Sequence, residues 1–83
     1  MYSKDVLQLM DRHGCGIGDT VAVKSTRGEL RGIIMPRIEL GDNNTIIIKL
    51  ENGYNIGINC NEIKEITLIE KKREIAPAHT ISA

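Results

Sequence analysis

The stretch that decides the fold runs from residue 45 to residue 60 and reads TIIIKLENGYNIGINC. Apolar residues recur at every second position on both sides of Asn52-Gly53, which is the period of a β-strand with one buried face. A two-residue loop at Asn52-Gly53 would place charged residues on the same face as the core. A three-residue loop over 51–53 instead pairs Ile48 with Ile56. Because a slip of one residue turns every side chain to the opposite face, burial selects the second register.

This register predicts the backbone of the turn. A three-residue hairpin loop combines a type I turn with a glycine bulge, so we expect Gly53 to have a positive φ. The same register pairs Leu50 with Tyr54 and predicts that the Tyr54 side chain points inward.

The rest of the chain predicts a small barrel. Ser3 can cap a helix of about residues 4–13, and Gly14 can end it. Three further period-two runs with turn signals between them follow the helix, so together with the hairpin we expect a mainly β fold: a small five-stranded SH3/Sm-like barrel preceded by a short N-terminal helix. We divide the chain into 1–16 (helix and connection), 17–70 (β-barrel domain) and 71–83 (tail or start of an interdomain linker).

Two glycines lie inside predicted strands, Gly32 and Gly57, where glycine marks a bend or a close backbone approach. A strand that curls beyond Gly32 would bury Ile33 and Met35. Without that curl, four apolar side chains face outward and become a candidate interface: Ile33, Met35, Ile47 and Ile69.

The composition argues against a dedicated binder of nucleic acid or membrane surfaces. Eleven Lys and Arg balance eleven Asp and Glu among the 83 residues, for a formal net charge of zero, whereas such binders usually carry a basic excess. The only basic cluster is 71–73, and single-strand binders stack bases on aromatic side chains, of which there are two. RNA is not expected as a partner.

No apolar run approaches the ~18 residues of a membrane span, and a cytoplasmic protein with reduced cysteines is expected.

The sequence predicts no catalytic, metal or cofactor site. His13, Cys15, Cys60 and His79 match no familiar zinc spacing, and Cys60 is better interpreted as a small buried apolar residue. Glycines at positions 14, 16 and 18 follow a helix and precede a strand, the reverse of the order that a dinucleotide loop requires. Nothing marks Cys15 as an activated nucleophile.

Three stretches carry a resemblance to a known family: GDTVAV at 18–23, MPRIELGD at 35–42 and IKLENGYNIGI at 48–58. Over about residues 17–70 the chain resembles the N-terminal domain of the D subunit of the archaeal glutamyl-tRNA(Gln) amidotransferase. The resemblance implies a parent polypeptide whose asparaginase-like domain releases ammonia from glutamine. It also implies a partner, the E subunit, which uses ATP and this ammonia to convert glutamate on tRNA(Gln) into glutamine.

The resemblance implies a non-catalytic docking or assembly domain, with the downstream asparaginase-like domain and the amidotransferase E subunit as partners. The catalytic threonines of the family, one of them in a Gly-Gly-Thr motif, have no counterpart here, since no Gly-Gly-Thr occurs. We expect the first domain of a longer subunit. The alternative is a free-standing small barrel that binds RNA or self-associates. The candidate interface residues are Ile33, Met35, Arg37, Glu39, Asp42, Ile47 and Asn55.

Overall fold

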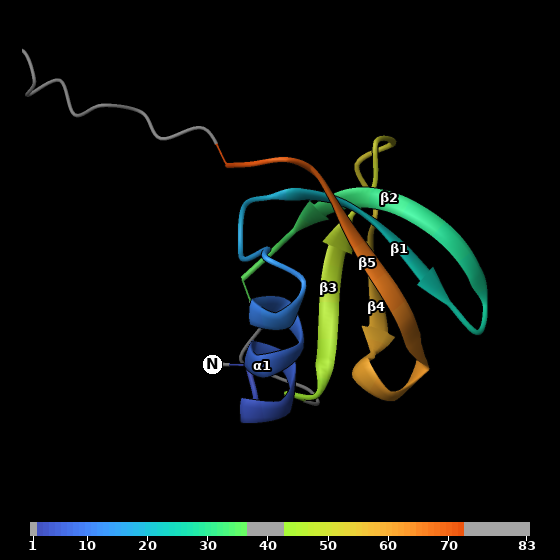
Figure 1. The fold of residues 1–83 in the computed structure, drawn as a ribbon. Helices are drawn as coiled ribbons and strands as arrows, with labels where there is room; N and C mark the ends of the chain where they lie inside the picture. Colours follow the sequence, from blue (N-terminus) through green and yellow to red (C-terminus); the bar gives the residue numbers. More distant parts are fainter. Residues whose placement is uncertain (1, 37–42, 73–83) are drawn as a thin grey trace, which may run out of the picture.

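A computed structural model describes residues 2–36 and 43–72 of the chain (Figure 1). The elements follow in the order α1 (Lys4–Arg12), β1 (Thr20–Ser25), β2 (Gly28–Ile34), β3 (Thr45–Lys49), β4 (Asn55–Asn59), a 3-10 helix η1 (Cys60–Glu62) and β5 (Ile63–Glu70). The strands form one curved antiparallel sheet of five strands in the order β4-β3-β2-β1-β5. The predicted mainly β fold with an N-terminal helix is confirmed.

The ends of α1 follow the predicted capping signals. The Ser3 hydroxyl accepts a hydrogen bond from the backbone N–H of Val6 at 3.2 Å, and so satisfies one donor that a helix start leaves unpaired. Gly14 follows the helix at φ 69°, a left-handed conformation that glycine adopts at little cost.

The β3–β4 hairpin has the register that burial selects. Ile46 pairs with Ile58 and Ile48 with Ile56. At the turn, the Leu50 N–H donates to the Tyr54 carbonyl at 2.8 Å, the Gly53 N–H donates to the Leu50 carbonyl at 2.9 Å, and Gly53 has φ 93°. The predicted three-residue loop and the positive φ of Gly53 are confirmed.

The prediction that Tyr54 points inward is wrong, because 72% of this residue is exposed. Tyr54 does continue the inner face of β4, but the hairpin extends beyond the strand that flanks it. Strand β2 pairs with β3 only at Ile33–Lys49 and Ile34–Ile48, and the tip of the hairpin projects past β2 (Figure 1). No other described element therefore covers the inner face of the sheet at Tyr54.

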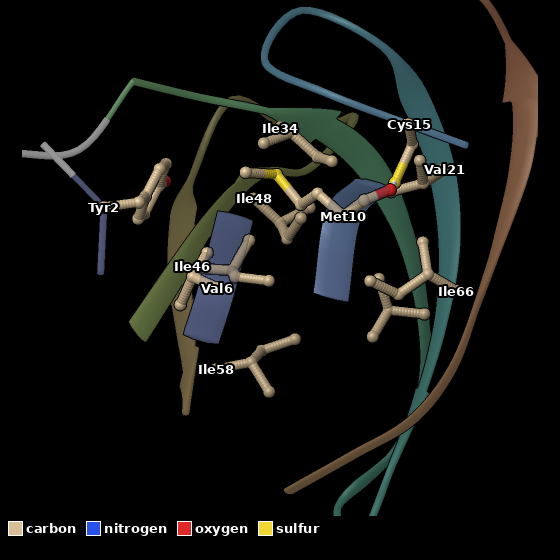
Figure 2. Packing of buried hydrophobic residues seen from close by; sticks show 11 residues of the cluster. Tyr2, Val6, Met10, Cys15, Val21, Ile34, Ile46, Ile48, Ile58 and Ile66 are labelled. Atoms are coloured by element: carbon tan, nitrogen blue, oxygen red, sulfur yellow. Dashed lines mark hydrogen bonds between the residues drawn. The ribbon is translucent and has the colours of Figure 1, made fainter. Parts of the chain in front are cut away.

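The core lies between the concave face of the sheet and α1. Figure 2 shows Val6 and Met10 of α1 among the isoleucines of the sheet. Tyr2 is buried as well: its hydroxyl donates to the Met35 carbonyl at 2.6 Å and accepts from the Ile47 N–H at 3.1 Å. This hydroxyl bridges β2 and β3 where they separate. The buried cluster consists of Tyr2, Val6, Met10, Cys15, Val21, Val23, Ile34, Ile46, Ile48, Ile58 and Ile66.

Gly32 marks the predicted close approach of two backbones. A Cβ atom at this position would lie 2.6 Å from Cγ2 of Ile48 and 2.9 Å from the carbonyl carbon of Lys49. Side chains of β2 nevertheless continue to alternate between the two faces after Gly32, since Ile34 is buried and Ile33 is 40% exposed. The strand could either curl and bury Ile33 or leave it facing outward, and the structure shows that Ile33 faces outward.

A buried carboxylate, Asp19, holds the end of β5 against the start of β1. Its Oδ1 accepts the Lys72 N–H at 2.6 Å, its Oδ2 accepts the Gly16 N–H at 2.9 Å, and the Lys71 ammonium lies 3.4 Å from Oδ2. Burial disfavours the charged form, but the hydrogen bonds from Lys72 and Gly16 and the charge of Lys71 outweigh it, so the pKa of Asp19 is lower than its ordinary value of 3.8.

We expect Ile48→Ala to lower the free energy of unfolding by about 2–5 kcal/mol, because it opens a cavity at a side chain with no exposed surface. Urea denaturation followed by circular dichroism measures this change. The matched control is Ile69→Ala on β5, where 42% of the residue is exposed and a change within about 0.5 kcal/mol is expected. Equal losses in the two variants would contradict the described core.

Asp19→Asn should lower the free energy of unfolding by about 1–3 kcal/mol at neutral pH, because the negative charge is lost and an NH2 group replaces one of the two oxygens that accept the Lys72 and Gly16 N–H groups. The pKa of Asp19 is depressed in the folded state, so its contribution is complete above the unfolded value of 3.8 and disappears as the pH falls through the folded value.

The difference between the unmodified chain and Asp19→Asn should therefore shrink below pH 3.8. Denaturation at a series of pH values measures it. Glu65→Gln is the control, because Glu65 and its partner Lys24 are both mostly exposed and a loss below about 1 kcal/mol is expected. A gap between Asp19→Asn and the unmodified chain that stays constant through this pH range would contradict the assigned role of Asp19.

Candidate protein interface

The sheet brings four of the predicted interface residues to one outer face. Residues that pair directly on neighbouring strands share a face, and Ile33 pairs with Lys49, which pairs with Asn55. Ile47 lies two positions before Lys49, and its carbonyl accepts the Met35 N–H at 2.8 Å. Ile33, Met35, Ile47 and Asn55 therefore lie on adjacent strands of the same surface. Three other predicted residues, Arg37, Glu39 and Asp42, are outside the described residues.

These four residues differ in exposure. Ile33 and Asn55 are exposed, whereas Met35 and Ile47 are half-buried. Among them, Ile33 is thus the apolar side chain most available to a partner.

A groove runs over this outer face beneath the tip of the β3–β4 hairpin. One part, of about 800 Å³, is lined by Ala22, Glu29, Arg31, Leu50, Glu51, Asn52 and Ile69. The adjoining part, of about 390 Å³, is lined by Thr20, Arg31, Gly32, Ile33, Lys49, Leu50 and Glu51. Because the two parts share Arg31, Leu50 and Glu51, we treat them as one feature, the outer groove.

Local backbone geometry places the apolar side chains of the outer groove. Thr20 of β1 pairs with Glu70 of β5, but the next residue, Val21, pairs with Leu68. Ile69 is therefore the extra residue of a β-bulge, and a bulge re-aims side chains at a sheet edge. Ile69 lines the groove together with Leu50 of the hairpin.

The polar residues of the outer groove carry both signs of charge. Arg31 and Lys49 are matched by Glu29 and Glu51. A single-strand nucleic-acid site instead needs an excess of positive charge and aromatic platforms. Apolar side chains bordered by polar and charged ones match the apolar core and polar rim of a protein interface.

Sequence patterns predict only part of the groove. Ile33 is among the predicted interface residues and Ile69 among the predicted outward-facing ones, whereas nothing in the sequence singles out Ala22 or Arg31. Leu50 is expected simply to oppose Tyr54 in the hairpin. Its position over β1 and β2 follows from the curvature of the sheet, for which the sequence carries only the weak signal of a glycine at position 32.

No described side chain has the surroundings of a catalytic nucleophile or a metal ligand set. Burial, followed by the negative charge of Asp19, raises the pKa of the Cys15 thiol, so this group stays protonated at neutral pH. Cys60 was expected to be buried, but it is only half-buried, because it lies at the start of η1, where the chain leaves β4, and packs against the margin of the core. Within 2–36 and 43–72, no three His, Cys, Asp or Glu residues gather in a way that could hold a metal ion. No helix in these ranges is long and apolar enough to cross a membrane.

A smaller hollow lies between α1 and η1. It measures about 270 Å³ and is lined mainly by polar side chains: Asp5, Gln8, Leu9, Arg12, Cys60, Asn61 and Ile63. It has fewer apolar lining residues than the outer groove, which remains the better candidate for a protein interface.

Comparison with known proteins identifies the family. The family described as the GatD N-terminal domain matches residues 15–69. The chain is similar to the D subunit of the glutamyl-tRNA(Gln) amidotransferase of Thermococcus kodakarensis, with 44% identity over 75 residues that make up 86% of this chain and 17% of the relative. It is also similar to the corresponding protein of Thermofilum pendens, with 42% identity over 71 residues (84% of this chain, 16% of the relative).

The corresponding protein of Pyrococcus furiosus is 38% identical over 78 residues, which cover 89% of this chain and 18% of that relative. The chain thus spans less than a fifth of the length of these relatives. The resemblance expected from the motifs at 18–23, 35–42 and 48–58 is confirmed, and the chain belongs to the GatD N-terminal domain family.

Proposed function

We propose that this chain is a non-catalytic docking domain of an archaeal, tRNA-dependent amidotransferase that forms Gln-tRNA(Gln) from Glu-tRNA(Gln). Its role is to hold the ammonia-releasing, asparaginase-like part of the D subunit in place within the cytoplasmic assembly with the E subunit. The observation that carries the proposal is the outer groove, in which exposed Ile33 and Ile69 lie among balanced charges.

Apolar exposure supports a permanent neighbour for this face. Ile33 and Ile69 are 40% and 42% exposed, and the groove adds Leu50 and Ala22 to their surface. Covering apolar area stabilises by about 25 cal/mol per Å². A domain of 83 residues has a thin core of its own, so contact with a larger neighbour adds a substantial fraction of its stability.

The direction of the chain after β5 supports the asparaginase-like part as that neighbour. Ile69 lines the groove, and the residues that follow β5, Lys71 and Lys72, are held by Asp19 at the same end of the sheet. An N-terminal domain is followed by the rest of its subunit, and the last described residues of this chain lie at the end of the sheet where Ile69 lines the groove. A downstream domain joined at this end by a short connection would reach Ile33 and Leu50.

The proposal is tested with the complete amidotransferase, the D and E subunits together, carrying Ile33→Lys in the domain. A lysine at this position introduces a charge that docking would have to desolvate, so the domain should detach from the asparaginase-like part. Limited proteolysis should then cut the interdomain connection at least about tenfold faster, the factor expected for a loss of ~1.4 kcal/mol. Glutamine hydrolysis by the complex should change little.

Leu7→Lys is the matched control, because Leu7 is also 40% exposed but lies on α1, away from the outer groove. It should leave the rate of proteolysis unchanged. If Ile33→Lys and Leu7→Lys are cut at the same rate as the unmodified enzyme, the groove is not the docking surface. Loss of glutamine hydrolysis in Ile33→Lys with normal assembly would argue for a catalytic role instead.

A further inference from the structure

The two edge strands of the sheet are protected to different degrees. Natural proteins block sheet edges with charged side chains and bulges, because an open edge templates pairing with another chain. β5 has both devices: Lys64, Glu65 and Glu70 are charged, and its pairing with β1 is interrupted at two places. β4 reads Asn-Ile-Gly-Ile-Asn, contains no charged residue, and pairs with β3 without interruption.

The outer edge of β4 presents backbone groups at Asn55 and Gly57. The flanking pairs define the alternation: the Leu50 N–H donates to the Tyr54 carbonyl, and the Cys60 N–H donates to the Asn44 carbonyl. Even-numbered residues of β4 therefore direct their backbone groups toward β3, and odd-numbered ones direct them away from it. In the sheet formed by the described strands, β3 is the sole strand neighbour of β4.

The sequence of β4 is a palindrome centred on Gly57. Reversing residues 55–59 returns the same residue types in the same order. An antiparallel pair of two such strands therefore places Asn opposite Asn, Ile opposite Ile and Gly opposite Gly. The two-fold axis of such a pair passes beside Gly57, the central residue of the symmetric order.

We propose that β4 pairs with β4 of a second copy of this chain, antiparallel and around a two-fold axis at Gly57. The contact uses the sheet edge and leaves the outer groove open, so it goes beyond the docking role and does not depend on it. Like-charge repulsion does not oppose it, because β4 is uncharged and the formal net charge of the chain is zero.

The geometry at the axis suits close approach. In this register Gly57 faces Gly57 of the second copy as a hydrogen-bonded pair, in which the two residues exchange both N–H···O bonds. Neither residue has a side chain that would obstruct the axis. Ile56 faces Ile58 of the second copy on the inner face, so the apolar surface of each core continues into the other.

The same register explains the exposed aromatic ring beside β4. In this register Asn55 faces Asn59 of the second copy, and the next pair outward is Tyr54 with Cys60. Tyr54 then lies on the inner face of the sheet, opposite Cys60 of the second copy. Tyr54 is 72% exposed in a single copy, and a large exposed aromatic next to an edge strand is typical of a contact surface. The paired strand covers one side of this ring.

Cross-linking between positions 54 and 60 tests the register. Even-numbered pairs are the non-hydrogen-bonded ones in the dimer, with Cα atoms about 4.5 Å apart, a separation that a disulfide accepts. Within one copy these positions lie about 20 Å apart along an extended strand, so no intramolecular bond can form. Under mild oxidation, Tyr54→Cys should form a covalent dimer through native Cys60, and mass spectrometry of the linked peptides should show this pair.

Ile69→Cys is the matched control, an exposed position on the other edge strand, and it should link to Cys60 at least about tenfold more slowly. Tyr54→Cys combined with Cys60→Ser should lose the 54–60 link. Equal rates for Tyr54→Cys and Ile69→Cys would overturn the proposal.

Sedimentation equilibrium of the chain without added cysteines provides an independent measurement. Its mass should rise to twice the monomer value with concentration. Asn55→Pro removes the backbone N–H of residue 55, which points away from β3 toward the second copy. Because the contact is two-fold symmetric, it loses two hydrogen bonds, and the dimer Kd should rise at least about tenfold. A monomer at all concentrations, an assembly larger than two copies, or a dimer indifferent to Asn55→Pro would each overturn the β4 pairing.

Discussion

The structure depends on the contact between α1 and the concave face of the sheet. Five short strands cannot bury a curved inner face by themselves, and the two edge strands, β4 and β5, stand at opposite ends of the strand order. Val6 and Met10 occupy the hollow of the sheet, and the Tyr2 hydroxyl bonds to the backbone of Met35 and Ile47. With the helix over the inner face, the two proposed contacts use other parts of the described sheet: its outer face and the edge of β4.

Patterns within single elements could be predicted from the sequence because short-range constraints decide them. The β3–β4 register follows from the position of charged residues relative to isoleucines, and the φ of Gly53 follows from the loop length that this register requires. The prediction for Tyr54 was wrong because the register determines only which face of the sheet a side chain lies on. Burial also requires another element that covers that face at the tip of the hairpin. The roles of Asp19 and Tyr2 could not be predicted for a related reason, since their partners lie tens of residues away in the chain.

The candidate interface likewise has a part that the sequence predicts and a part that it does not. Ile33, Met35, Ile47 and Asn55 lie on one face because strand alternation and pairing put them there. The hollow beside them could not be predicted from alternation. It requires the β-bulge at Ile69 and the curvature that carries Leu50 over β1. The bulge depends on the pairing of β5 with β1, far apart in the chain, and Gly32 is the one local signal for the curvature.

The outer groove and the β4 edge are compatible within one assembly. Pairing through β4 prolongs the sheet in its own plane, whereas the groove is bounded by β1, β2, β5 and the hairpin tip, on the far side of β3 from that edge. A two-fold axis at Gly57 would therefore relate two outer grooves, one in each copy. In such an arrangement the edge contact would join two copies of the domain while each groove stays open to its proposed docking partner, so the two proposed contacts do not compete for one surface.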